Sequence, residues 1–207
     1  MNRSVLLLVP LIAACHPAPD ASAQQGDGSA RPDCEWCGTG EAPANLASSI
    51  RIAEPGEPGE PLTVHGVVYR PDGRTPAPGV ILYLYHTNAR GVYPRRGNET
   101  GNAVRHGYLR GWLRTDAQGR YRFTTIRPAS YPGRTDPQHI HVNVLEPGGR
   151  SEYWLNSFVF DDDPRLTPAE RARLGTRGGS GIMRPVRQNG VWTATRNIVL
   201  PTPEETR

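Results

Sequence analysis

Turn-forming residues interrupt this chain so often that long helices have little room. Its 207 residues include 23 Gly and 21 Pro, and both residue types break helices and favour turns. Between the turns lie short runs rich in Val, Thr, Ile and Tyr, which are residues that favour strands. The sequence therefore predicts an all-β domain of short strands, and the chain is long enough to bury one core.

Seven runs are predicted to be the strands of an antiparallel β-sandwich. They cover 63–69, 80–86, 107–114, 120–126, 139–145, 153–160 and 191–200. The run 80–86 is apolar on both faces, which predicts a central strand. Thr167, Pro168 and Glu170 form a capping box with proline at the first helical position, so a short helix should begin there and end near Leu174. The sandwich should span 45–200, with a tail over 201–207.

The N-terminus has the features of an export signal. Asn2 and Arg3 are followed by a short apolar run over 5–14, too short to cross a bilayer and suited to a signal peptide. The run ends Ile-Ala-Ala-Cys, which resembles a bacterial lipobox with Cys15 as the lipidated residue. Residues 1–15 are thus a predicted signal peptide. The expected location is lipid-anchored, periplasmic or at the cell surface, and the alternative is an ordinary signal peptide that contains a cysteine.

Residues 16–44 are the predicted tether, because their Ala, Pro, Ser, Gln and Gly residues have little to bury. The tether holds a C-x-x-C pair, Cys34 and Cys37. One such pair supplies only two of the four ligands of a zinc site, and no βαβ pattern accompanies it. In an exported protein the pair favours a local disulfide, with a redox or metal role as the alternative.

The charged residues exclude some functions. All 24 basic residues are Arg, so neither a lysine Schiff base nor a lysine general base is available. They are interleaved with 20 acidic residues, for a net charge of +4. No basic stripe forms, so nucleic acid is not an expected partner.

The sharpest local feature is the run His139-Ile140-His141. Side chains alternate faces along a strand, so the two imidazoles should share one face. Two such imidazoles can reach a single metal ion, although two exposed or hydrogen-bonded histidines would leave the same pattern.

Two tyrosines strengthen the metal interpretation. Tyr93 and Tyr131 each precede a proline in a loop that follows a predicted strand. A phenol ordinarily titrates near pH 10, so a phenolate at neutral pH needs a strong local cation. Hard anionic oxygen favours iron(III), so Tyr93, Tyr131, His139 and His141 are the predicted ligands of one Fe(3+) ion.

Over 66–163 the chain resembles the intradiol ring-cleavage dioxygenases, non-haem iron(III) enzymes that open catechols between the two hydroxyls. The resemblance rests on these stretches: Pro78–Val80, Tyr85–Tyr93, Leu109–Pro132 with its Thr-Asp-x-x-Gly turn, and His139–Val142. It implies the four iron ligands named above and a small aromatic diol and O₂ as reactants. The implied product is a cis,cis-muconate-type acid. Tyr93 is the implied catalytic phenolate that takes a substrate proton, and a homodimer is the expected assembly by analogy.

The residues around the expected pocket depart from the family pattern. Asp136 stands where aromatic-acid members carry an Arg that stabilises charge on the substrate, and Arg134 is the expected replacement. Asp136 is alternatively a hydrogen-bond acceptor for a ligand imidazole. His106, Arg110 and Asp136 are the further candidates for substrate binding, while Arg95 and Arg105 are candidate anion binders or plain surface residues.

Two other interpretations remain open at this point. The run 66–126 also resembles carboxypeptidase-regulatory and transthyretin-like modules, which would make the chain a non-catalytic binding domain. A third interpretation is an iron-binding protein that has lost turnover, because the expected Arg is missing. The combination of two tyrosines and two histidines distinguishes the iron protein from a bare sandwich.

Overall fold

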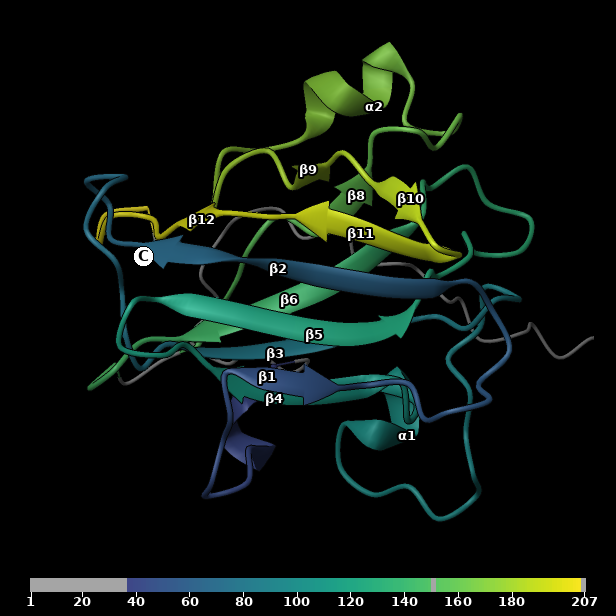
Figure 1. The fold of residues 1–207 in the computed structure, drawn as a ribbon, viewed down its shortest axis with the longest axis horizontal. Helices are drawn as coiled ribbons and strands as arrows, with labels where there is room; N and C mark the ends of the chain where they lie inside the picture. The colour runs from purple at the N-terminus through teal and green to yellow at the C-terminus, as the bar shows by residue number, and fades with distance from the viewer. Residues whose placement is uncertain (1–36, 150–151, 206–207) are drawn as a thin grey trace, which may run out of the picture.

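The computed structural model describes residues 37–149 and 152–205, which form two packed β-sheets (Figure 1). The first sheet runs in the order β1 (Ser49–Arg51), β5 (Arg120–Ile126), β2 (Pro61–Tyr69), β11 (Val191–Thr195) and β10 (Val186–Gln188), with β12 (Ile198–Val199) also on β2. The second runs in the order β4 (Arg110–Arg114), β3 (Ile81–His86), β6 (His139–Leu145), β8 (Phe158–Phe160) and β9 (Ile182–Met183), with β7 (Tyr153–Trp154) on β6. The predicted all-β sandwich is confirmed.

Most strand pairs are antiparallel, but the sandwich is not purely so. The long pairs β2/β5, β3/β4 and β3/β6 are antiparallel, whereas β1/β5, β2/β11, β2/β12 and β8/β9 are parallel. Each parallel pair includes a strand of five residues or fewer. The long pairs follow the predicted antiparallel arrangement, and the short parallel pairs are additions to it.

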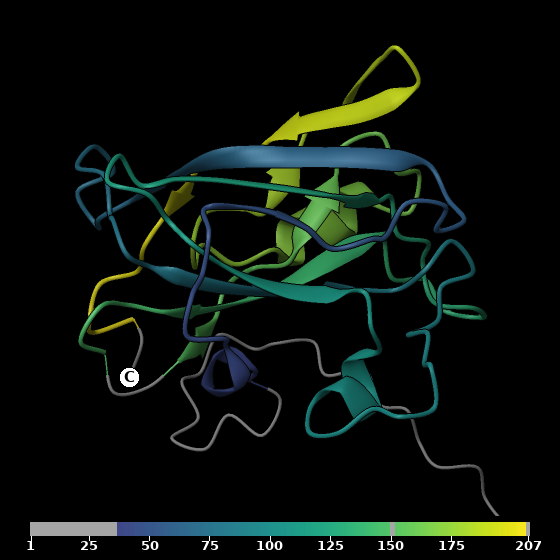
Figure 2. The ribbon, with the colours of Figure 1, turned by 60° about the horizontal axis from the view of Figure 1, so that its bottom comes forward.

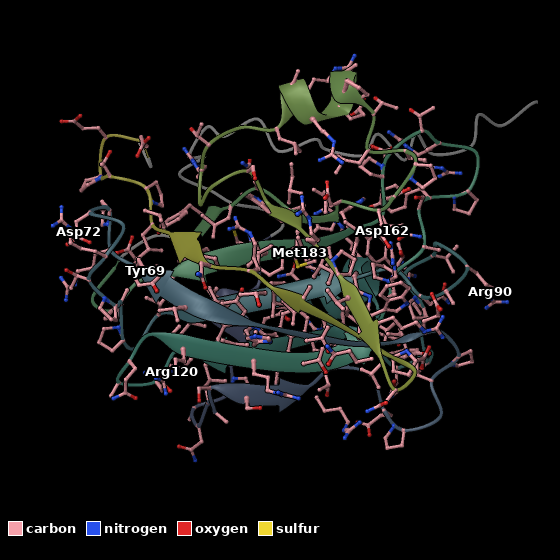
Figure 3. All side chains as sticks on the ribbon, turned by 45° about the horizontal axis from the view of Figure 1, so that its top comes forward. Tyr69, Asp72, Arg90, Arg120, Asp162 and Met183 are labelled. Atoms are coloured by element: carbon pink, nitrogen blue, oxygen red, sulfur yellow. The ribbon has the colours of Figure 1, made fainter. Side chains whose placement is uncertain are left out.

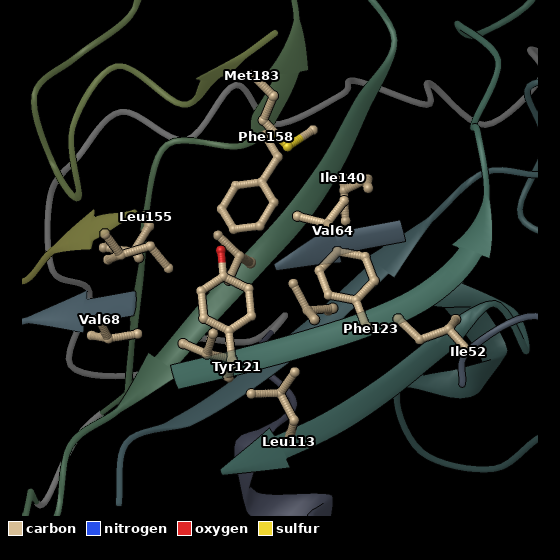
Figure 4. Close-up of a cluster of buried hydrophobic side chains, with 14 of the residues drawn as sticks. Ile52, Val64, Val68, Leu113, Tyr121, Phe123, Ile140, Leu155, Phe158 and Met183 are labelled. Carbon is tan, nitrogen blue, oxygen red and sulfur yellow. The ribbon is translucent and has the colours of Figure 1, made fainter. Parts of the chain in front are cut away.

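The core lies between the facing surfaces of the two sheets. Strand alternation sends Val64 and Phe123 inward from the first sheet, and Ile140 and Phe158 inward from the second (Figure 4). All four side chains are fully buried. Burial of such apolar side chains contributes roughly 1.5–3 kcal/mol each, so this interior holds the two sheets together.

The opposite face of the second sheet carries the aromatic and polar side chains of β3 and β6. Tyr85 pairs with His141 across these strands, and Tyr83 pairs with Asn143. Helix α1 (Ala103–His106) and the short 3₁₀ helix η1 (Thr39–Glu41) lie beside this face, away from the first sheet (Figure 2). Strand β3 is therefore buried on both sides, as its apolar sequence predicts.

The predicted helix is confirmed as α2 (Pro168–Arg173), where the Thr167 hydroxyl accepts a hydrogen bond from the Glu170 N–H at 3.2 Å. The predicted strands over 120–126 and 139–145 match β5 and β6. The run 153–160 forms two strands instead of one. The sequence pattern gave no sign of β1, β9, β10, α1 or η1, each of which is four residues or shorter.

The predicted signal peptide, its lipobox at Cys15 and Cys34 of the C-x-x-C pair lie outside the described residues. Cys37 is disulfide-bonded and 8% exposed, and its Sγ accepts a hydrogen bond from Asn143 Nδ2 at 3.2 Å. This end of the expected tether thus packs on the second sheet. Within 37–149 and 152–205, no helix is long and apolar enough to span a bilayer.

Candidate metal centre

Four donor atoms converge beside the polar face of the second sheet. Tyr131 Oη lies 2.5 Å from Tyr93 Oη, 3.1 Å from His139 Nε2 and 3.1 Å from His141 Nε2. The two Nε2 atoms are themselves 3.1 Å apart. The structure therefore brings together all four residues that the sequence predicts as ligands.

The two histidines come from one strand and the two tyrosines from two loops. His139 and His141 alternate with buried Ile140 along β6, as the H-x-H pattern predicts. Tyr93 and Tyr131 follow β3 and β5, and their loops are bonded together. The Thr87 hydroxyl donates to Ala129 O at 2.6 Å, and the Ala129 N–H donates to Asn88 O at 3.1 Å. These bonds bring the two phenols to one place.

An ion pair between Arg127 and Asp162 helps to fix the start of β6. Arg127, which follows β5, donates to both carboxylate oxygens of Asp162 at 2.6 and 2.8 Å, and its Nε donates to Gln138 Oε1 at 2.8 Å. The Gln138 N–H in turn donates to Asp163 Oδ2 at 2.6 Å. Asp162 and Arg90 lie at the same end of the sandwich, opposite Tyr69 and Asp72 (Figure 3). The residue before His139 is thus fixed from two sides.

The two imidazoles have different partners for their second nitrogen. His139 Nδ1 lies 2.7 Å from Pro137 O, so Nδ1 carries the proton and Nε2 keeps its lone pair for a metal. Asp136, which the sequence offered as the acceptor for a ligand imidazole, does not fill that role. Among the described residues, the partner of His141 Nδ1 is Ser157 Oγ at 3.4 Å, and the His141 ring stacks on Tyr85, with ring centroids 4.6 Å apart.

The spacing of the four atoms fits a shared metal ion. Ligands bound at about 2.0–2.1 Å lie roughly 2.8–3.4 Å from one another around one ion, close to the 2.5–3.1 Å separations here. In the described part of the chain, no group of three or more His, Cys, Asp or Glu side chains is placed to hold a metal. The tyrosine oxygens are therefore essential to any metal site at this position.

Burial sets the charge state of the four groups. Desolvation lowers the pKa of His139 and of His141, so both imidazoles are neutral at physiological pH. Desolvation and the neighbouring Tyr131 raise the pKa of Tyr93 well above its usual range, and desolvation raises the pKa of Tyr131. With no cation in the site both phenols keep their protons. A bound trivalent ion would reverse this preference, because it is the largest charge nearby.

The other candidate residues lie around this centre. Arg134 Nε pairs with Asp136 Oδ2 at 2.9 Å, so these two candidates for substrate binding neutralise each other. Arg110 pairs with Glu41 at 2.7 Å and donates to Tyr83 Oη at 3.3 Å. His106, at the end of α1, is 3% exposed.

Sequence reasoning missed Tyr85, whose ring lies against both His106 and His141, with centroids 3.7 and 4.6 Å away. The signal was present in the alternation Tyr83-x-Tyr85, which puts both rings on the face that carries the two ligand histidines. This alternation was overlooked because a strand that is apolar on both faces is interpreted as part of the hydrophobic core.

A further buried histidine makes folding sensitive to acid. His86 Nε2 and Nδ1 lie 2.7 Å from Thr125 Oγ1 and 2.8 Å from Thr87 O, and desolvation lowers its pKa to about 4. In the unfolded chain the pKa of His86 has its ordinary value near 6.5. Above pH 6.5 the imidazole is neutral in both states, and as pH falls toward 4 protonation of the unfolded chain lowers the free energy of unfolding. At pH 5 the loss is about 2 kcal/mol.

We expect this loss in the wild-type chain but not in His86→Gln, which cannot titrate. The difference between the two in free energy of unfolding should shrink by about 2 kcal/mol when pH is lowered from about 7.5 to about 5. Urea denaturation of both proteins at the two pH values measures it. A difference that is the same at both pH values would contradict the assignment.

Comparison with known proteins agrees with this arrangement of donors. A family model described as "Dioxygenase" matches residues 40–168. Catechol 1,2-dioxygenase 1 of Acinetobacter lwoffii is 35% identical over 113 residues, which cover 54% of this chain and 35% of that protein. The protocatechuate 3,4-dioxygenase beta chain of Burkholderia cepacia is 34% identical over 122 residues, covering 54% of this chain and 49% of that one. The chain thus spans half or less of the length of these relatives.

Solved structures give the same fold. The dioxygenase domain of a dioxygenase–carbohydrate-binding fusion from Streptomyces sp. SirexAA-E matches with a TM-score of 0.54 and 27% identity, covering 77% of this chain and 94% of that one. Catechol 1,2-dioxygenase from Acinetobacter sp. ADP1 matches with a TM-score of 0.58 and 22% identity, covering 77% and 59%. With the family model matched over more than half of its length, the chain belongs to the intradiol dioxygenase family, whose members use non-haem iron.

Proposed function

We propose that this chain is an iron(III) intradiol dioxygenase, which inserts both atoms of O₂ into a catechol-type aromatic to give a cis,cis-muconate-type product. The observation that carries the proposal is the convergence of two phenol oxygens and two imidazole Nε2 atoms, all within 2.5–3.1 Å of Tyr131 Oη or of each other. Tyr93, Tyr131, His139 and His141 would hold the ion. Bound ferric iron supplies Lewis acidity toward the two catechol oxygens and orients the ring.

The chain's own residues would provide the bases and the geometry. Two phenolates and two neutral imidazoles bring a trivalent ion to a charge of about +1, so a doubly charged catecholate is well matched to the site. Tyr93 Oη is the base that we propose takes a proton from the substrate. Burial raises the pKa of this phenol well above its usual range, which favours the protonated form once no cation faces it. The Pro137 carbonyl keeps His139 in the tautomer that leaves Nε2 free.

A second candidate function is iron binding without turnover. It is favoured by the ion pair between Arg134 and Asp136, 2.9 Å long, because the guanidinium expected to stabilise charge on the substrate is already neutralised. This pair is partly exposed, with 40% of the Arg134 side chain accessible, so it can reopen at a low energetic cost.

The test uses the full chain, reconstituted with ferric iron and freed of excess metal. An iron assay and a visible spectrum come first, and a phenolate-to-iron(III) band is expected. Anaerobic catechol should shift the band, and oxygen should then be consumed with formation of a muconate-type acid. A shifted band without oxygen uptake would favour the binding protein over the enzyme. A colourless chain that stays iron-free would refute both.

A further inference from the structure

The peptide bond between Pro137 and Gln138 is hydrogen-bonded at both of its polar ends. Its carbonyl oxygen, Pro137 O, lies 2.7 Å from His139 Nδ1. Its N–H, which belongs to Gln138, donates to Asp163 Oδ2 at 2.6 Å. One planar unit therefore connects a carboxylate to the imidazole of a candidate metal ligand.

The two hydrogen bonds of this unit reinforce each other. No peptide bond in the described part of the chain is cis, so the N–H and the C=O of the unit point in opposite directions. A negative charge at the N–H end attracts the amide hydrogen and shifts electron density toward the carbonyl oxygen, so the two bonds strengthen one another. Pro137 O is therefore a stronger acceptor for the Nδ1 proton of His139 than an ordinary backbone carbonyl.

The Asp163 carboxylate is buried and is satisfied by backbone donors. The residue is 6% exposed, its Oδ1 accepts from the Arg165 N–H at 3.0 Å, and its Oδ2 accepts from the Gln138 N–H. No ion pair among the residues that the structure describes includes Asp163. Hydrogen bonds from N–H groups stabilise a carboxylate in its charged form. Its charge is thus directed at the peptide and is not cancelled by a guanidinium.

A turn after β8 places Asp163 beside the start of β6. The two strands are antiparallel, with Val159 opposite His139. The chain then turns back, and the Asp163 N–H donates to Phe160 O at 3.1 Å. The Leu166 N–H donates in turn to Asp163 O at 2.9 Å. Backbone hydrogen bonds on both sides therefore hold the carboxylate against the peptide bond that precedes β6.

The side chain of Gln138 fixes the same peptide from a third direction. Gln138 Oε1 accepts from Arg127 Nε at 2.8 Å. The Arg127 side chain is only 10% exposed, and its Cζ lies 4.6 Å from the centroid of the Phe160 ring. Rotation of the peptide would break the contacts with Asp163 and with Arg127 together. The orientation of its carbonyl is therefore set by the packing around it.

We propose that Asp163 is a positioning residue of the metal centre, which acts through the Pro137–Gln138 peptide to orient His139 and to increase electron donation by its Nε2 atom. The inference rests on the proposed function, because it assigns a role toward the same ferric ion. A carboxylate bonded directly to a ligand histidine fixes its tautomer and raises its basicity. The peptide transmits that effect from Asp163, while Asp136 is paired with Arg134 at 2.9 Å.

The second ligand imidazole has weaker support. Among residues 37–149 and 152–205, the partner of His141 Nδ1 is the hydroxyl of Ser157 at 3.4 Å, which is longer than an ordinary hydrogen bond. The effect of Asp163 is therefore confined to one of the two imidazoles, that of His139.

The test measures the iron(III) dissociation constant of the full chain by competition with a chelator and records the phenolate-to-iron(III) band. Asp163→Asn keeps the shape and one acceptor oxygen but removes the charge, and Asp163→Ala removes the acceptor as well. We expect the dissociation constant to rise about tenfold in the first variant and up to about 100-fold in the second. The band should move to longer wavelength in both, because iron that receives less charge from His139 accepts charge from a phenolate more readily.

Asp161→Asn is the matched control. It makes the same substitution two positions away, in a carboxylate that pairs with Arg171 at 2.6 Å and with Arg184 at 3.2 Å. It should change the dissociation constant by less than about twofold and leave the band in place, because these ion pairs are partly exposed. Urea denaturation shows whether each variant is folded, and Asp163→Asn alone decides the outcome if Asp163→Ala does not fold.

Wild-type affinity and an unmoved band in the Asp163 variants would overturn the proposal. Weaker iron binding with an unmoved band would also overturn it, since a purely structural role would produce that result. An equal effect of Asp161→Asn would show that the charge of the segment matters and not the contact with the peptide. The expected response to Asp163 without oxygen uptake by the wild type would contradict the proposed enzyme and still support the role of Asp163. A wild-type chain that takes up no iron refutes both.

Discussion

Tyr131→Phe is expected to weaken the visible phenolate-to-iron band to the contribution of Tyr93 and to reduce turnover of catechol to about 1% or less of the wild type. Tyr131 Oη is the one donor atom that lies within 2.5–3.1 Å of all three others. Its loss removes an anionic ligand and raises the charge of an iron(III) site from about +1 to about +2. Loss of groups that only support a metal ligand already costs about 10–100-fold in affinity or activity, so a lost ligand should cost more.

The comparison is made on the reconstituted chain by iron assay, visible spectrum and oxygen uptake, with circular dichroism as a check on folding. Tyr69→Phe serves as the control, because Tyr69 lies at the end of β2 opposite the Asp162 end (Figure 3). It should keep full colour and turnover. If Tyr131→Phe retained wild-type iron content and activity, Tyr131 would not be a ligand.

The second large effect is expected from Gly91→Ala, which should cost about 3 kcal/mol or more of folding stability and displace Tyr93. Gly91 is buried and has a φ of +77°, and a Cβ at this position would overlap the carbonyl oxygen of Ser130. The loops that carry the two tyrosines meet at this point. The substitution therefore adds a steric clash to the usual strain of a left-handed backbone.

Gly133→Ala separates these two contributions. Gly133 has a φ of +71°, but a Cβ atom added there would meet no atom within 4 Å, so only the backbone strain applies. It should cost about 1–2 kcal/mol and leave the iron band intact. Urea denaturation and the visible spectrum of both variants check the prediction. Equal losses of stability would mean that the two loops do not need close contact at Gly91.

The sequence alone predicted the parts of this protein that depend on local pattern. Strand alternation over β5 and β6 predicted both strands to the residue, and it put His139 and His141 on one face. The capping box at Thr167 predicted α2. In each case the governing interactions join residues a few positions apart, so short-range periodicity carries the information.

Tertiary structure decided the elements and contacts that local pattern does not specify. Strands β9 and β10 have two and three residues, too few to show a period, and they exist because neighbouring strands offer unpaired backbone groups. The meeting of Tyr93 with Tyr131 depends on hydrogen bonds between loops 38 positions apart. The stacking of His106 on Tyr85 likewise depends on how α1 packs against the Tyr93 loop. The residue types at the metal centre could be read from the chain, but their distances and tautomers follow only from long-range packing.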